Sequence, residues 1–263
     1  NATFTGPVLL GADVIVSTAA GANDGTITFS STIDSSGGAR NLDLVSDDAA
    51  VTISGTIGDS SALATLDINE ADAQTGAITV AAIGGSSAGV TGVTNIGNDD
   101  STSVTLSGAD YNTDGATYFE AASGGSINIT GVNADFDTNN DVLSFLVAPT
   151  ALGQDAGTVT MTTAGGALSF AGALDGNASN AQNLTISTTG GAVTFTGRVG
   201  GTQPLNNLVV NSSSGAGAIT FTEDIGQGSA GLTGTSTIGN TSTGSITFSN
   251  NIYNLDKAKN CRS

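Results

Sequence analysis

Two acidic runs carry the side chains whose types and spacing could do chemistry. The first, DYNTDG, has oxygen-bearing side chains at alternate positions, Asp110, Asn112 and Asp114, and ends in Gly115. This D-x-N-x-D-G spacing is typical of loops that wrap a hard cation in oxygen ligands. A complete helix-flanked calcium motif would place a carboxylate at position 121, which is alanine, whereas Glu120 lies one place earlier. The run therefore predicts a Ca²⁺ site with an incomplete motif.

The second run, DFDTNND, has the same alternation without the glycine. Its candidate ligands are Asp135, Asp137, Asn139 and Asp141. Another interpretation stays open for both runs, because Asp and Asn side chains also cap turns. We expect no required cofactor, and Ca²⁺ is the ligand that these residue types favour.

Nucleophilic and acid–base catalysis find little support in the composition. The chain has no histidine, which excludes Ser-His and Cys-His pairs. Adjacent carboxylates such as Asp99 and Asp100 point to opposite faces of a strand, so they make a poor glycosidase pair. Only Arg40 and Arg198 precede the C-terminal tail, so a site for an anionic sugar is not expected. We expect a protein that is not an enzyme.

The charge balance limits the classes of binding partner that we expect. Five Lys and Arg against 23 Asp and Glu give a formal net charge of −18, which repels nucleic acid and anionic lipid. Acidity also keeps a Thr-rich β protein soluble and discourages edge-to-edge strand pairing. No apolar run is long enough for a spanning helix. We therefore expect neither nucleic-acid binding nor membrane insertion of this segment.

The elements that must position these side chains come from an internal repeat. Phrases such as DGTITFSSTID, GGAVTFTGRVG and TGSITFSNNIY recur along the chain. Successive phrases start at a nearly constant spacing of about 25 residues. The exception is the longer interval between Ile127 and Leu168, which predicts an insertion-bearing coil at about 128–167. The first apolar residue of each phrase is its anchor: Ile27, Val51, Ile78, Val104, Ile127, Leu168, Val193, Ile219 and Ile246.

Each phrase has the pattern of a short strand followed by a corner. The anchor and the residue two places on are apolar, as in Ile27 and Phe29, which is the period of a strand with one face inward. A small or polar residue follows at +4, where a bend would let an aliphatic residue at +6 point inward again. The aliphatic side chains at this later position are Ile33, Ile57, Leu174, Val199, Ile225 and Ile252.

Short strands and corners at this period predict an all-β fold, a β-solenoid of the right-handed parallel β-helix type with coils of about 25 residues. Two immunoglobulin-like sandwiches are the alternative, because their strands also recur about every 8–12 residues. A sandwich gives no reason for one spaced triplet to recur in coil after coil. We assign the solenoid to residues 1–254 and a polar basic tail to residues 255–263.

The stretches NLDLVSDDAAVTISGTIG and NLTISTTGGAVTFTGRVG resemble repeats of large bacterial surface proteins, the filamentous-haemagglutinin-like and autotransporter-type adhesins. The resemblance covers residues 1–60 and 157–253. It implies an extracellular or cell-surface stalk used in adhesion or fibre formation. The implied partners are further copies or neighbouring repeats of the same protein and a host or matrix surface. An export signal would lie outside this segment, and Cys261 has no second cysteine with which to form an internal disulfide.

A threonine follows many of the anchors and would point outward. Flat Thr arrays can order water and bind ice, although Thr also simply favours exposed strand positions. We therefore expect a structural or adhesive protein, with a ligand-binding solenoid that has an ice-binding or carbohydrate-binding face as the alternative. The predicted column comprises Thr28, Thr52, Thr79, Thr105, Thr194, Thr220 and Thr247.

Overall fold

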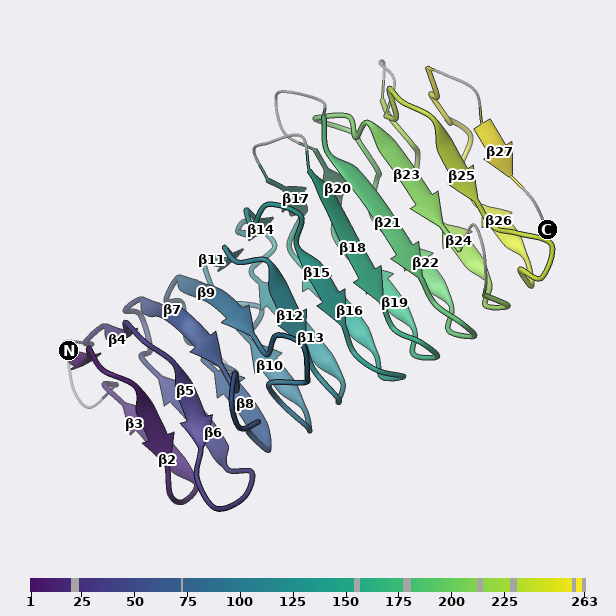
Figure 1. The fold of residues 1–263 in the computed structure, drawn as a ribbon. Helices are drawn as coiled ribbons and strands as arrows, with labels where there is room; N and C mark the ends of the chain where they lie inside the picture. The colour runs from purple at the N-terminus through teal and green to yellow at the C-terminus, as the bar shows by residue number, and fades with distance from the viewer. Residues whose placement is uncertain are drawn as a thin grey trace.

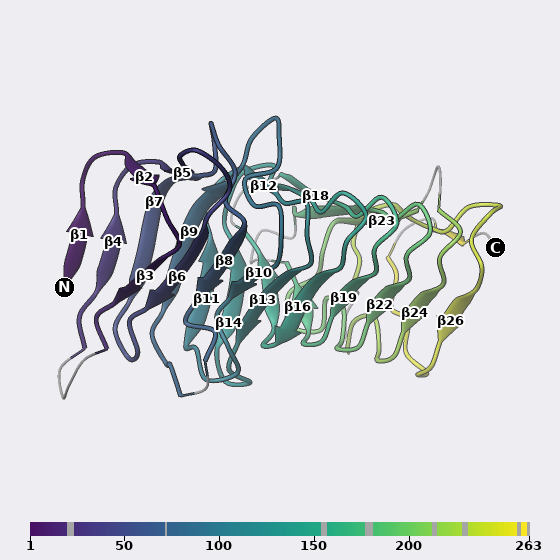
Figure 2. The ribbon, with the colours of Figure 1, turned by 90° about the horizontal axis from the view of Figure 1, so that it is seen from below.

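The computed structural model is a β-solenoid, in which short parallel strands stack along one axis from the N-terminal coil to the C-terminal coil (Figures 1 and 2). It describes residues 1–19, 24–71, 73–153, 157–176, 181–211, 215–227, 231–256 and 259–261. These residues form strands, turns and bends and contain no helix. The predicted all-β class is confirmed, and so is the coil length of about 25 residues, which the strand pairings repeat along the axis.

Each coil contributes to three faces, named here in chain order. The first face contains β1 (Ala2–Phe4), β4 (Ile27–Phe29), β7 (Val51–Ile57), β9 (Ile78–Ile83), β11 (Ser103–Leu106), β14 (Ser126–Ile129), β17 (Thr150–Leu152) and β20 (Leu174–Asp175). The second face contains β2 (Val8–Leu10), β5 (Ile33–Ser35), β12 (Asp110–Asn112), β15 (Asp135–Asp137), β18 (Thr158–Thr162), β21 (Asn183–Ser187), β23 (Asn207–Val210), β25 (Ser236–Ile238) and β27 (Lys259–Cys261). The third face contains β3 (Val14–Ser17), β6 (Asn41–Val45), β8 (Thr65–Ile68), β10 (Thr94–Ile96), β13 (Thr117–Ala121), β16 (Leu143–Val147), β19 (Leu168–Phe170), β22 (Val193–Phe195), β24 (Ile219–Phe221) and β26 (Ile246–Phe248).

The first and second faces form one 17-stranded sheet, and the third face is a separate sheet of ten strands. The first and second faces are joined because β7 and β9 continue around the corner between them. β7 pairs with β4 on the first face and with β5 on the second. An irregularity in the register between Ile53 and Thr56 marks this corner. The strand pairings described are all parallel, as a solenoid requires.

The nine sequence anchors do not form one column but lie on two faces. The first five stack on the first face, where Ile27 pairs with Val51 and Val51 with Ile78. The last four stack on the third face, where Leu168 pairs with Val193. The repeated phrase therefore turns the first-to-second corner early in the chain and the third-to-first corner later.

The long interval between Ile127 and Leu168 is this change of face, and the predicted insertion at 128–167 is absent. Ile127 pairs with Thr150 in the coil that follows it, and Leu168 pairs with Leu143 in the coil that precedes it. Both steps match the length of the other coils. The anchor pattern missed Thr150 because this buried position of the first-face column is polar.

The C-terminal coil differs from the sequence pattern in two ways. Ile252 is 41% exposed, and its neighbour Tyr253 takes the inward position by pairing with Ile225. Strand pairing also passes the predicted boundary at 254, because Leu255 bridges to Leu232 and β27 pairs with β25. Part of the predicted tail thus belongs to the solenoid.

A column of stacked phenylalanines fills the core behind the third face. Adjacent ring centroids lie 4.7–5.5 Å apart, and from Phe145 onward adjacent rings lie within 12° of parallel. The strand spacing of about 4.8 Å places each ring over the next one. The column contains Phe119, Phe145, Phe170, Phe195, Phe221 and Phe248.

Glycines allow the coils to approach each other at the corners. A Cβ atom at Gly191 would overlap the carbonyl oxygen of Gly166, and one at Gly217 would overlap that of Gly191. Side-chain hydrogen bonds join other turns: Asn69 Nδ2 donates to Ser46 Oγ over 3.0 Å. The same bond recurs between Asn211 Nδ2 and Thr188 Oγ1 at 3.0 Å.

We expect Gly191→Ala to lower the melting temperature strongly, because the new methyl group has no room beneath the neighbouring coil. Gly190→Ala is the matched control, since nothing lies within 4 Å of its Cβ position. Differential scanning calorimetry of the two variants checks this. Equal melting temperatures would contradict the close coil-to-coil contact at Gly191.

We expect Phe170→Ala to lower the free energy of unfolding by about 3–5 kcal/mol, because a buried ring is replaced by a cavity. Phe170 is 1% exposed and stacks on both neighbours. Phe248→Ala should cost less, because Phe248 ends the described column and is 40% exposed. Urea unfolding followed by circular dichroism measures both losses, and the reverse order would refute this role of the column.

Candidate functional site

The two acidic runs lie next to each other on the outside of the second face. We call Asp110, Asn112, Asp135 and Asp137 the acidic patch. β12 pairs with β15, so that Asp110 lies beside Asp135 and Asn112 beside Asp137. These side chains point outward because the residue between each pair, an aromatic, points into the core, where the two rings stack at 4.7 Å. A single coil step thus brings together two runs that are separate in the sequence.

The D-x-N-x-D-G run is a strand followed by a turn. Asp110 and Asn112 lie on β12, where alternation directs both side chains to the same side. Asp114 comes after the strand, and its Oδ1 accepts a hydrogen bond of 2.6 Å from Asn139 Nδ2 of the next coil. The run therefore extends along the face rather than curling around a central cation.

The second run caps a turn through its side chains and backbone. Asp137 Oδ1 accepts a hydrogen bond of 2.9 Å from the backbone N–H of Asn139. Thr138 Oγ1 donates to the carbonyl oxygen of Asp141 over 2.6 Å, which closes the turn. The capping interpretation of Asp and Asn is confirmed for Asp137 by this geometry.

Glu120 does not join the acidic patch. It lies on β13 of the third face, with Leu146 beside it on β16. Burial raises the pKa of the Glu120 carboxyl, and the negative charge of Asp99 raises it further. Closeness in sequence groups Glu120 with the D-x-N-x-D-G run, but a corner of the coil separates positions 112 and 117 and places it on another face.

The acidic patch concentrates negative charge. Burial raises the pKa of the Asp135 carboxyl, and the nearby carboxylates of Asp137 and Asp110 raise it further. Parallel register causes this repulsion by placing like residues in adjacent coils. Within the ranges that the structure describes, no three His, Cys, Asp or Glu side chains form a group that could hold a metal ion. The Ca²⁺ site stays a prediction from the sequence.

A second acidic arrangement, on the third face, was not singled out from the sequence. Asp43 and Asp67 lie side by side on β6 and β8. The pKa of Asp43 is raised by burial and then by the charges of Asp67 and Glu70. Asn95, one coil further, donates through Nδ2 to Asp67 Oδ1 over 2.7 Å. The recurrence of L-D-L and L-D-I at the same place in two strands was the signal that could have found it.

Carboxylates outside the patch hold turns together. Asp100 Oδ2 accepts a hydrogen bond from the backbone N–H of Ala73 at 2.9 Å, and Asp48 Oδ1 accepts one from Thr75 Oγ1 at 2.7 Å. Each bond joins two coils. These contacts give a structural role to one member of each adjacent carboxylate pair, Asp100 of Asp99–Asp100 and Asp48 of Asp47–Asp48.

The predicted threonine column is divided between two faces. Thr28, Thr52, Thr79 and Thr105 stack on the first face, and Thr3 extends them by one coil. The other three members stack on the third face: Thr194, Thr220 and Thr247. The continuous array expected of an ice-binding plane is thus replaced by two shorter ones.

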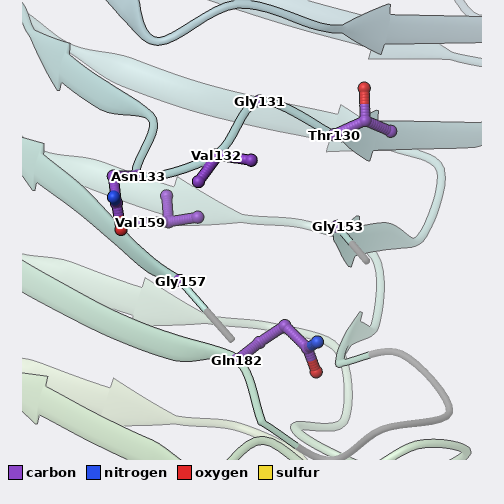
Figure 3. Close-up of a pocket in the computed structure, with 8 residues that line it drawn as sticks. All are labelled: Thr130, Gly131, Val132, Asn133, Gly153, Gly157, Val159 and Gln182. Carbon is purple, nitrogen blue, oxygen red and sulfur yellow. The ribbon is translucent and has the colours of Figure 1, made fainter. Parts of the chain in front are cut away.

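Figure 3 shows a small hollow between coils at the corner where the first face passes into the second. Its volume is about 10 Å³, room for roughly one water molecule. It is too small for an organic substrate. It is lined by Thr130, Gly131, Val132, Asn133, Gly153, Gly157, Val159 and Gln182.

Comparisons of the chain with protein-family models, curated proteins and solved structures give no match. The fold itself, a repeat solenoid, is of the kind expected from the adhesin resemblance. Among the described residues, no helix has the length and apolar character needed to cross a membrane.

We expect Asp135→Asn to stabilise the protein at pH 7 by a few tenths to about 1 kcal/mol, because it removes a like charge from a cross-strand pair. A carboxyl whose pKa is raised by folding binds its proton more tightly in the folded state. The wild type therefore gains stability as pH falls through this raised pKa, and the gain is complete below the ordinary value of 3.8.

Thermal unfolding between pH 7 and pH 3.5 measures the difference between the variant and the wild type, which should shrink as the pH falls. Asp59→Asn is the control, because Asp59 lies on an exposed turn outside the patch and its loss changes the net charge equally. A difference that stays constant with pH, or that Asp59→Asn reproduces, would show that repulsion at Asp135 is not its source.

Proposed function

We propose that this chain is a non-enzymatic structural or adhesive protein of the bacterial cell surface or its surroundings, in which the solenoid is a stalk or fibre-forming segment. The observation that carries the proposal is the continuous parallel register of the third face, ten strands from β3 to β26. At about 4.8 Å per strand this is a rod about 45 Å long. Such a rod keeps its two ends at a fixed distance.

The composition of the surface supports the same proposal. A net charge of −18 keeps an elongated β protein soluble, while the aliphatic and aromatic side chains are stacked inside. The resemblance of the repeats to filamentous-haemagglutinin-like and autotransporter-type adhesins supports an extracellular location. The partners we propose are copies or neighbouring repeats of the same protein and a host or matrix surface.

Immunogold electron microscopy of the cells that make this chain tests the proposal. Antibodies raised against the purified solenoid should label intact cells, their surface fibres or the surrounding matrix. An antibody against a ribosomal protein is the control for cell integrity. Labelling that requires permeabilised cells, and that lies in the cytoplasm, would overturn the proposal.

A further inference from the structure

Tyr118 is the one aromatic residue of the described chain that lies on the outward side of a face. The nine phenylalanines lie on the inward side of their strands or columns, and most of them stack in pairs or columns. Tyr111 is buried, and Tyr253 packs against Phe248. On β13 the burial alternates, so that its threonine and phenylalanine point inward and Tyr118 points outward, half-buried. Its hydroxyl makes no hydrogen bond within the described residues.

Polar groups lie on both sides of this ring. Asn95 precedes Tyr118 in the outward column and Ser144 follows it. The Asn95 amide is held by Asp67 at 2.7 Å, and the Ser144 hydroxyl lies 2.9 Å from that of Ser169. Because Asn95 is tied to the neighbouring coil, its position is set before any ligand arrives. Ser144 is buried and borders the ring without facing outward solvent.

The ring also has apolar neighbours and a carboxylate on its own strand. Val93, one coil earlier, is 41% exposed, and Leu146, one coil later, is half-buried on the same outer surface. Glu120, two residues along β13, presents a hydrogen-bond acceptor on the same side as Tyr118. An aromatic ring with apolar flanks and fixed polar groups around it is the composition of a small-ligand platform.

The charge of the surroundings selects the ligand class. Asp67 and Glu120 carry acceptors that hydroxyl groups can satisfy, and they repel carboxylates and sulfates. Of the described arginines, Arg40 precedes β6, three coils before β13, and Arg198 is paired with Asp224 at 3.8 Å. A neutral sugar meets these conditions, because its C–H groups pack on the electron-rich ring face and its hydroxyls bond to the carboxylates and the nearby amide.

We propose that Tyr118, with Asn95, Asp67 and Glu120, forms a binding platform for neutral glycans on the third face. This inference rests on the proposed adhesive function and names a ligand class for it. The stalk would then make contact through its side as well as its ends.

Two-dimensional ¹H–¹⁵N NMR titration of the purified chain tests the platform. The probes are cellohexaose, mannohexaose and galactohexaose as neutral glycans, and a heparin hexasaccharide as the anionic one. At least one neutral probe should give saturable shifts at residues around Tyr118 below about 10 mM, whereas heparin should not. Tyr118→Ala should weaken the binding at least tenfold, and Tyr118→Phe should leave it within about threefold, because the ring is retained.

Thr194→Ala is the matched control, since Thr194 lies in the same outward column three coils further on. Its affinity should equal that of the wild type, and the melting temperatures of all variants establish that they are folded. Absence of saturable shifts with every neutral probe, equal affinity of Tyr118→Ala, or preferential binding of heparin would overturn the inference. Because NMR does not depend on where the protein resides, a negative result here with surface labelling by immunogold would reject the platform alone.

Discussion

Parallel pairing in register is the constraint on which the whole structure depends. Each residue of one coil lies about 4.8 Å from its equivalent in the next, so any side chain must be compatible with its own neighbour along the axis. Stacked apolar side chains satisfy this condition because they neither repel one another nor need hydrogen-bond partners. This explains the aliphatic columns of the first face and the column of rings behind the third. The glycine corners follow from the same rule, since a Cβ there would enter the adjacent coil.

The same constraint penalises charge. A carboxylate placed at one level meets whatever occupies that level in the next coil, as Asp43 meets Asp67 and Asp110 meets Asp135. Amide and hydroxyl side chains are better suited to stacking in register, because each can both donate and accept a hydrogen bond. Asn95 beside Asp67 is one example. The stacked Asn and Thr turns are another, in which a single side chain joins two coils.

Function in such a molecule must come from differences between coils on the outside, because the inside is nearly uniform. Among the places on the described surface that depart from the repeating Thr, Ser and Ala pattern are the acidic patch of the second face, the Asp43 and Asp67 pair of the third face, and Tyr118 with its polar surroundings. A rod that repeats its core while varying its outer columns can hold a contact surface at a set position along a stalk, which agrees with an adhesive role.

The sequence alone determined the fold class, the coil length and most of the inward residues, because alternation and the repeat period are local properties of the chain. Ile27, Phe29 and Ile33 could be assigned to the core from spacing alone. Which face each phrase occupies was decided only by the tertiary structure, since it depends on the length of every preceding corner. Buried Thr150 concealed one step of the column, so the change of face looked like an insertion. The arrangement of the site also depended on the lengths of the corners. The two acidic runs meet because one full coil separates them, and Glu120 lies on another face because a corner intervenes.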